Sequence, residues 1–316
     1  MKMNIKDKLR ALFTHPGNIH VEGESNKGKR KENQDNILMI SPLKDKTFAA
    51  RYYKNDHLQE NQMNDWNEDY VRIAVADGMG GHMHGKEIAE STIEALIHKP
   101  PHTTVYEMRD SILDIHSTLQ KKYASENEKR PGTTLVLADI HRKTLKTILL
   151  NIGDSRAYII EKNRWMNKTC DHTITEFCYR DGEIDKSDYD DQIDVSTSEI
   201  VQALGYGSRG IIKDKKGYKP IRFSKDLRID IAQDLPRKLS RHADVASFYL
   251  KKEQVFVLAS DGLWCADSTN QWILDDDINY FHKDAPLKLI NNALEKGSND
   301  NISVVICGFP KSEPGQ

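Results

Sequence analysis

The chain has 316 residues, of which 38 % are hydrophobic and 30 % charged, and its formal net charge is −2 at pH 7. This length allows one large domain or two ordinary ones, and the near-neutral charge provides no overall field that would attract nucleic acid or an anionic membrane. No apolar stretch approaches membrane-spanning length, and the first residues, MKMNIKDKLRALF, are too short and too charged for a signal peptide. We therefore expect a cytoplasmic protein.

The spacing of the cysteines excludes several kinds of site. Cys170, Cys178, Cys265 and Cys307 form no C-x-x-C pair, so neither a zinc knuckle nor a redox motif is indicated. None of them is followed by an arginine six residues later, which is the spacing of a phosphatase loop with a cysteine nucleophile. We expect ordinary reduced thiols.

The first part of the chain predicts one helix, two strands and a long loop. Residues 3–13 have an amphipathic helical pattern, and IHVEGES (19–25) and NILMIS (36–41) have the composition of strands. Residues 42–70 are polar, with scattered aromatic residues and no clear period. We expect a functional or mobile loop there, because structureless loops of that length are uncommon inside compact domains.

The middle of the chain combines strand-like and helical patterns. VRIAVA (71–76) is β-branched and aliphatic and predicts a buried strand, and the apolar spacing in 86–98 and 104–123 predicts two antiparallel helices. TTLVLADI, KTILLNIG and RAYIIEK, between residues 133 and 162, predict consecutive strands of an antiparallel meander.

The last part of the chain begins with two segments that have no regular apolar pattern. Residues 162–200 are acidic and weakly patterned, and residues 206–250 form a long charged stretch. Beyond them we expect strands in QVFVLAS (254–260) and NISVVICGF (301–309), and helices near 269–275 and 285–296, the second capped by Gly297. Strands in consecutive runs around helix pairs favour an α+β fold with antiparallel sheets over a parallel doubly wound fold.

Two Asp-Gly pairs, at 77–78 and 261–262, follow buried strand-like runs. A single Asp-Gly is more often only a turn, although its glycine also lets backbone approach a ligand closely. With Asp154 in NIGDSR and Asp300 in GSNDN, these pairs put four carboxylates at strand ends, where they can converge. Clusters of oxygen ligands suit Mg²⁺ or Mn²⁺ rather than zinc, so we predict a site for hard divalent cations.

Read in order, six motifs resemble those of a known enzyme family. They are RKENQD (30–35), DGMGGH (77–82), GTT (132–134), GDSR (153–156), SDGLW (260–264) and DNIS (300–303). Each motif is weak alone, but the ordered series closely resembles the metal-dependent type 2C serine/threonine protein phosphatases, the PPM family, in its bacterial form. The resemblance covers roughly residues 17–309.

This resemblance implies a four-layer α-β-β-α sandwich, in which two antiparallel β-sheets are flanked by helix pairs and the metals lie at one end. We expect a single phosphatase domain over residues 1–316. Its parts would be a core of about 17–309, a flap-like segment at about 162–200, insertions at about 42–70 and 206–250, and a tail at 310–316. The insertions fit partner recognition and tolerated surface lengthening equally well, since a longer loop costs little.

The resemblance also implies a role for each residue of the site. The metal ligands would be Asp77, bridging two ions, the Gly78 carbonyl, Asp261, Asp300 and, for a third and weaker ion, Asp154. Asp35 would hold metal-bound water beside them, and Arg30 would grip the phosphate with its planar fork. The cofactor would be Mn²⁺ or Mg²⁺, and a hydroxide bridging the two core ions would attack phosphorus in line without a covalent enzyme intermediate.

Two positions depart from the family pattern. Gln34 stands where many eukaryotic members have a glutamate ligand, so we expect a weaker or water-mediated contact there. Met79 replaces the histidine proposed as general acid in animal members, so the leaving oxygen would take its proton from metal-bound water or another group. Neither change removes a core ligand.

Other motif residues are expected to be structural. Thr133 and Thr134 should satisfy local backbone groups, and Arg156 should form an ion pair. Trp264 should pack in the core. His82 lies in a glycine-rich turn, where a structural role is more common than ligation.

The expected reaction is hydrolysis of phosphoserine and phosphothreonine on proteins. The partners would be phosphorylated proteins and an opposing serine/threonine kinase, and we expect a monomer that binds no nucleic acid and no membrane. Two alternatives stay open. One is a pseudophosphatase that only binds, against which the retention of Asp77, Asp261 and Asp300 argues. The other is a hydrolase of small phosphoesters on the same scaffold, since a fold does not fix its substrate.

Overall fold

The computed structural model describes residues 19–43, 47–80, 84–123, 131–193, 200–214, 217–264 and 281–310, with the backbone alone between 210 and 223. The helices predicted at 3–13 and near 269–275, His82, and the tail beyond 310 lie outside the described residues. Within the described part, no helix is both long enough and apolar enough to span a membrane.

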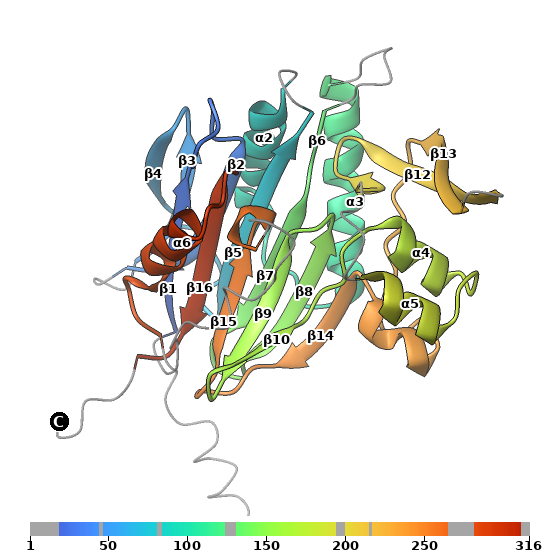
Figure 1. Ribbon diagram of the computed structural model, residues 1–316. Helices are drawn as coiled ribbons and strands as arrows, with labels where there is room; N and C mark the ends of the chain where they lie inside the picture. Colours follow the sequence, from blue (N-terminus) through green and yellow to red (C-terminus); the bar gives the residue numbers. More distant parts are fainter. Residues whose placement is uncertain are drawn as a thin grey trace, which may run out of the picture.

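Two antiparallel β-sheets form the centre of the molecule (Figure 1). Their strands are β1 His20–Asn26, β2 Asp35–Pro42, β3 Phe48–Lys54, β4 His57–Gln62, β5 Tyr70–Met79, β6 Gly132–Thr133, β7 Leu135–His141, β8 Lys146–Ile152, β9 Arg156–Glu161, β10 Arg164–Asn167, β14 Val245–Tyr249, β15 Val255–Ala259 and β16 Ile302–Gly308. The larger sheet has the order β14-β8-β7-β5-β2-β3-β4, with β6 paired to β5, and the smaller sheet has the order β1-β16-β15-β9-β10.

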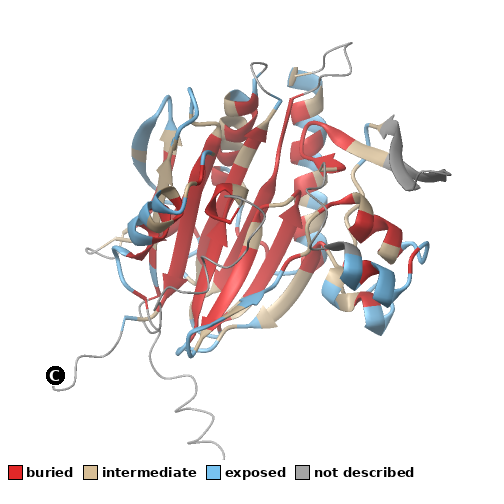
Figure 2. Ribbon diagram, in the orientation of Figure 1, coloured by how far each residue is buried: buried red, intermediate tan, exposed pale blue. Residues whose placement is uncertain are grey.

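Helices cover the outer faces of both sheets, which confirms the layered α+β architecture. Helices α2 (Gly85–Ile97) and α3 (Val105–Tyr123) lie against the larger sheet, and α6 (Ala285–Glu295) lies against the smaller one. Three buried apolar clusters correspond to the three interfaces between these four layers. Along β5, Ile73 and Val75 point between the sheets while Ala74 and Ala76 face the helices, as strand alternation requires. Figure 2 shows the central strands buried along most of their length.

The prediction of a loop over 42–70 was wrong. Strands β3 and β4 form a hairpin that extends the larger sheet at its edge. Asn55 and Asp56 make its two-residue turn, with φ angles of 50° and 63°. Asn and Asp tolerate this left-handed conformation, which the twist of a hairpin favours. The alternation in FAARYYK is weak because both faces of β3 are partly buried.

The predicted meander was wrong for its third strand. β7 and β8 are neighbours in the larger sheet, whereas β9 crosses to the smaller sheet and pairs with β15. Gly153, with φ +99°, lies at the crossing. The apolar pattern of a strand does not say which of two stacked sheets it joins, since each sheet buries such residues.

The segments at 162–200 and 206–250 contain regular structure. The first includes β10, α4 (Ile174–Arg180) and α5 (Lys186–Ile193). The second forms β12 (Gly207–Asp214) and β13 (Gly217–Ser224), which pair in a small third sheet with β11 (Gln202–Ala203). It then forms the 3-10 helix η1 (Arg237–His242) and β14. Because β14 pairs with β8, the end of this predicted insertion belongs to the main sheet.

A buried ion pair fixes the α2–α3 connection to the larger sheet. Arg72 on β5 and Asp139, opposite it on β7, both have fully buried side chains, and Arg72 Nε lies 2.7 Å from Asp139 Oδ1. Arg72 also donates to the carbonyls of Leu96 and Lys99, and Asp139 accepts the backbone N–H of His102. Burial alone would raise the pKa of Asp139, but the Arg72 guanidinium and His102 outweigh it and lower that pKa to about 2.

Replacing Asp139 by Asn should lower the free energy of unfolding by about 3–5 kcal/mol, because Arg72 would stay buried without its charged partner. Equilibrium unfolding in urea measures the change. Asp114→Asn removes a solvent-exposed pair with Lys99 and serves as a matched control that should change little. Equal unfolding midpoints for the two variants would contradict the expectation.

Candidate metal centre

The carboxylates singled out in the sequence meet around one site that both sheets build. Asp77 lies in β5, and Asp35 lies directly opposite it in β2. Asp261 follows β15 and opens the 3-10 helix η2 (Asp261–Leu263), and Asp300 lies two residues before β16. Asp154 lies in the connection between β8 and β9, where the chain passes from one sheet to the other.

A cavity of about 420 Å³ joins these residues. Its lining includes all the predicted site residues except Asp35, namely Arg30, Asp77, Gly78, Asp154, Asp261 and Asp300. Asp35 is only 5 % exposed and lies outside this lining, in the position expected of a group that acts from behind the ligands. Gln34 and Met79 also line the cavity, as does Ile200, the last residue of the flap-like segment.

Glycine is required at both Asp-Gly pairs by close backbone approach. A Cβ atom on Gly78 would lie 2.3 Å from the carbonyl oxygen of Gly85. A Cβ atom on Gly262 would lie 1.9 Å from the carbonyl oxygen of Asn301. Neither glycine has a positive φ, so contact rather than turn geometry decides the residue type. Each pair thus places its aspartate at a point where two backbone segments touch.

The two threonines of the GTT motif hold Asp77 in place. Thr134 Oγ1 accepts the backbone N–H of Asp77 at 3.1 Å, and Thr133 Oγ1 donates to the Asp77 carbonyl at 3.0 Å. Thr134 is fixed in turn by a 2.7 Å hydrogen bond with Ser155. The expectation that these threonines satisfy backbone groups is confirmed. The groups are the backbone N–H and the carbonyl of Asp77.

Ser260, beside Asp261, was missed by the sequence reasoning. Its hydroxyl donates to Asp35 Oδ2 at 2.7 Å and accepts the backbone N–H of Ser303 at 2.9 Å. It therefore ties the larger sheet to the smaller one beneath the site. Its position inside the SDGLW motif was the available signal.

Asn301, next to Asp300, was also missed. Its side-chain amide donates to the carbonyls of Lys27 and Glu32, at 2.9 Å each, and its oxygen accepts the N–H of Gln34 at 2.9 Å. These bonds fix the loop that carries Arg30. An asparagine can do this because its amide both donates and accepts.

Arg30 and Arg156 have different surroundings. Arg30 is 59 % exposed on the cavity rim, and its Nη2 lies 2.6 Å from Asp300 Oδ2. Arg156 pairs with Asp171 at 2.7 Å and lies 4.6 Å from the ring centroid of Trp264, which is buried. The structural expectations for Arg156 and Trp264 are confirmed.

Burial and mutual repulsion raise the pKa values of the aspartates. Burial, with help from the charges of Asp261 and Asp300, raises the pKa of Asp35 to about 7. Burial and the charge of Asp300 raise the pKa of Asp261 to about 6. The pKa of Asp77 is raised well above its usual range by burial and Asp35, and that of Asp154 by burial and Asp261.

Three of these carboxyl groups keep an oxygen without a hydrogen-bond partner. The Oδ1 atoms of Asp35, Asp154 and Asp261 are buried and receive no hydrogen bond. Such orphaned acceptors are costly in a protein interior. Divalent cations would satisfy them and remove the repulsion between the carboxylates, and oxygen donors are those that Mg²⁺ and Mn²⁺ prefer. The residues therefore fit a metal centre.

Comparison with known proteins points to the same family as the motifs. Residues 41–176 match the family model described as Protein phosphatase 2C. The serine/threonine phosphatase stp of Listeria welshimeri is 31 % identical over 125 residues, which are 37 % of this chain and 49 % of that protein. A putative protein phosphatase 2C-type of Streptococcus pyogenes is 30 % identical over 119 residues, 35 % of this chain and 48 % of that protein. The chain thus spans about half the length of the curated relatives it matches.

Solved structures match nearly the whole chain. The serine/threonine phosphatase of S. agalactiae superposes with a TM-score of 0.59 at 21 % identity, covering 92 % of this chain and 99 % of that one. Stp1 of Staphylococcus aureus gives 0.59 at 20 % identity, with 93 % and 96 % covered. The catalytic domain of PstP in complex with two manganese ions gives 0.54 at 19 % identity, with 93 % and 99 % covered. These matches confirm the predicted fold, and the family match confirms the resemblance over residues 41–176.

The raised pKa values predict how the metal-free protein responds to pH. Folded Asp35 and Asp261 hold protons up to about pH 7 and 6, whereas an unfolded aspartate loses its proton near its ordinary value of 3.8. Stability is therefore greatest below the unfolded pKa and is lost as pH rises through the folded pKa values.

In EDTA, the Tm should fall between about pH 5.5 and 7.5, and Mn²⁺ should raise the Tm more at the higher pH, where fewer protons compete. Thermal unfolding followed by circular dichroism measures this. In Asp261→Asn the fall in Tm should be smaller. A metal-free Tm that rises over this interval would overturn the assignment of buried, protonated carboxyl groups.

Proposed function

We propose that this chain is a metal-dependent protein phosphatase that hydrolyses phosphoserine and phosphothreonine on proteins. The observation that carries the proposal is the convergence of Asp77, Asp154, Asp261 and Asp300 on one cavity with Arg30 at its rim. All six sequence motifs, four from the first half of the chain and two from the second, contribute residues to that cavity. The family match over residues 41–176 and the phosphatase fold support the same reaction.

Divalent cations would be held by Asp77, the Gly78 carbonyl, Asp261 and Asp300, with Asp154 available to a third ion. When bound, such ions supply water activated for attack on phosphorus and neutralise charge on the phosphoryl oxygens. The role of the surrounding protein is to hold these ligands in place. Asp77 is held by threonine hydrogen bonds, and Asp35 is held by Ser260.

Arg30 is suited to bind and orient the phosphate. A guanidinium has five N–H donors, so a bond to Asp300 leaves others for phosphoryl oxygens. Its planar fork can bond two such oxygens at once, which fixes the phosphate in one orientation. The loop that carries it is held by Asn301 rather than by regular secondary structure.

The leaving oxygen needs a proton that Met79 cannot supply. Met79 lines the cavity at the position of the histidine found in animal members, and a thioether has no proton to donate. Asp35 and Asp77 are buried and would be ionised beside cations. Water in the cavity would therefore protonate the serine or threonine oxygen.

The pseudophosphatase and the small phosphoester hydrolase are the two alternatives. The orphaned oxygens of Asp154 and Asp261 favour a centre that binds cations, which the proposed hydrolysis requires and a pure binding module does not. The rim includes Arg30, Lys31 and Ile200 and is open at the surface, which suits a phosphorylated side chain projecting from a protein. Mn²⁺ or Mg²⁺ as the bound ion remains a prediction. So do an opposing kinase, a monomeric state, no binding of nucleic acid or membrane, and a cytoplasmic location.

With Mn²⁺ present, the purified chain should hydrolyse a phosphothreonine peptide, and Asp77→Asn should show no measurable turnover, because a central ligand would be lost. Phosphate release measures both rates. Asp110→Asn, which removes an exposed carboxylate, is the matched control and should retain the wild-type rate. Wild-type protein that binds Mn²⁺ in calorimetry but releases no phosphate would support the binding module instead.

Arg30→Ala should lower kcat/KM for the peptide by about 10²–10³-fold, the usual effect of removing a donor that stabilises charge in the transition state. Arg30→Lys should recover only part of the loss, because an ammonium lacks the planar fork. The ratio of kcat/KM for the peptide to that for small phosphate esters separates a protein phosphatase from a small-molecule hydrolase. A ratio below one would overturn the proposed substrate class.

A further inference from the structure

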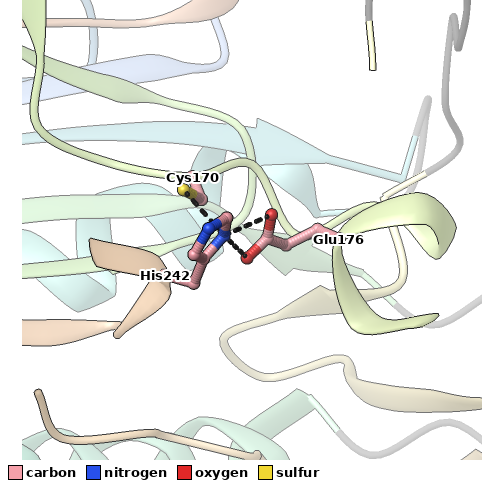
Figure 3. A group of neighbouring side chains, drawn as sticks. All are labelled: Cys170, Glu176 and His242. Carbon is pink, nitrogen blue, oxygen red and sulfur yellow. Dashed lines mark hydrogen bonds and ion pairs between the residues drawn. The ribbon is translucent and has the colours of Figure 1, made fainter. Parts of the chain in front are cut away.

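A second group of side chains of the types that bind metals lies outside the lining of the carboxylate cavity. Cys170 is in the loop between β10 and α4, Glu176 is in α4, and His242 ends η1. Their ligand atoms, a thiol sulfur, a carboxylate oxygen and an imidazole nitrogen, all lie within 4.8 Å of one another (Figure 3). Three separate segments of the chain bring them together.

The geometry points to a shared cation rather than to a proton relay. Cys170 Sγ lies 3.7 Å from His242 Nδ1, and the same nitrogen lies 3.0 and 3.2 Å from the two oxygens of Glu176. A nucleophile relay needs the thiol and the carboxylate on different ring nitrogens, so that one orients the imidazole while the other gives up its proton. Here both groups face Nδ1. Ligands about 2.0–2.3 Å from a tetrahedral zinc ion are themselves roughly 3.3–3.7 Å apart, close to these separations.

The carboxylate already has the outer hydrogen bonds that metal ligands usually have. Glu176 is 1 % exposed and accepts from Arg180 Nε at 2.6 Å and from the Tyr189 hydroxyl at 2.7 Å. The carboxylate is therefore fixed in direction, as ligating carboxylates are in known sites.

The group also has an entry path. Cys170, His242 and Tyr189 line a cavity of about 800 Å³, larger than the cavity of the carboxylate centre. Three protein ligands leave a fourth position of a tetrahedral ion open to this cavity. Lys168, Lys238 and Arg241 lie on the same lining, so a fourth ligand with negative charge would suit it.

We propose that Cys170, Glu176 and His242 form a zinc site, separate from the carboxylate centre, that joins α4 to the segment before β14. Sulfur and nitrogen ligands select zinc over Mg²⁺ and Mn²⁺, which the oxygen-only centre prefers. On binding, the zinc–sulfur bond replaces the thiol S–H bond and the thiol proton goes to solvent. The imidazole proton moves from Nδ1 to Nε2, and Glu176 exchanges its bond to that proton for one to the ion. No oxidant or reductant is required.

Cobalt titration of the full-length chain tests the proposal, because Co²⁺ replaces zinc and gives a charge-transfer band only when sulfur is a ligand. Excess Mg²⁺ keeps the carboxylate centre occupied. We expect the band to saturate at one equivalent of Co²⁺ and to disappear when Zn²⁺ is added. It should be absent in Cys170→Ser and His242→Asn, but unchanged in the controls Cys178→Ala and His57→Asn.

Tyr189→Phe provides a milder variant, since it removes only an outer hydrogen bond on Glu176. It should weaken Co²⁺ binding by about 10–100-fold while keeping the band. A variant that fails to fold is identified by its circular dichroism spectrum. A further measurement uses only the wild-type chain and so does not depend on whether the variants fold. In it, Zn²⁺ should slow the alkylation of Cys170 by iodoacetamide, which mass spectrometry maps.

Absence of a sulfur band at one equivalent, a band that persists in Cys170→Ser, or alkylation of Cys170 that Zn²⁺ does not slow would each overturn the zinc site. None of these readouts depends on phosphatase activity. The proposal therefore stands or falls separately from the proposed function.

Discussion

Burial of several carboxylates side by side is the constraint on which the rest of the structure depends. Asp35 and Asp77 face each other across two central strands, and Asp261 approaches from the other sheet. Without positive charge these groups repel one another, and burial with this repulsion raises the pKa of Asp35 to about 7, that of Asp261 to about 6 and that of Asp77 well above its usual range. Such an arrangement contributes little to the stability of the fold unless cations neutralise the carboxylates. The carboxylates thus mark the end of the sandwich where the proposed reaction would take place.

The scaffold opposes this repulsion by fixing backbone on every side of the site. Gly78 and Gly262 allow backbone segments to touch beside the aspartates, and Ser260 links the two sheets beneath them. On the outer face of the larger sheet, the buried pair of Arg72 and Asp139 holds the helical layer in place. The charges of this ion pair neutralise each other, whereas Asp35, Asp154 and Asp261 keep oxygens without a partner. The proposed zinc site has softer ligands and stands apart in both position and chemistry.

Much of the fold was predictable because its central strands and helices have strong, regular apolar patterns. The strands at β2, β5 and β16 and the helices α2 and α3 were found in this way. The hairpin at 48–62 was missed because its turn is Asn-Asp rather than Asn-Gly and its outer strand is almost fully exposed. The sheet to which β9 belongs was also missed. The sheet that β9 joins is decided by its partner β15, which lies about 100 residues later in the chain. The local apolar pattern of β9 does not encode that partner.

The sequence by itself determined the chemistry of the main site. Asp77, Asp154 and Asp261 are recognisable because each stands beside a glycine after an apolar strand, and Asp300 because its DNIS motif completes the ordered series. Only the tertiary structure decided how Ser260 and Asn301 serve them, and that Cys170, Glu176 and His242 meet. The physical reason is distance along the chain. Metal ligands and hydrogen-bond partners act over a few ångströms, and residues 66 to 72 positions apart reach that range only in the folded chain.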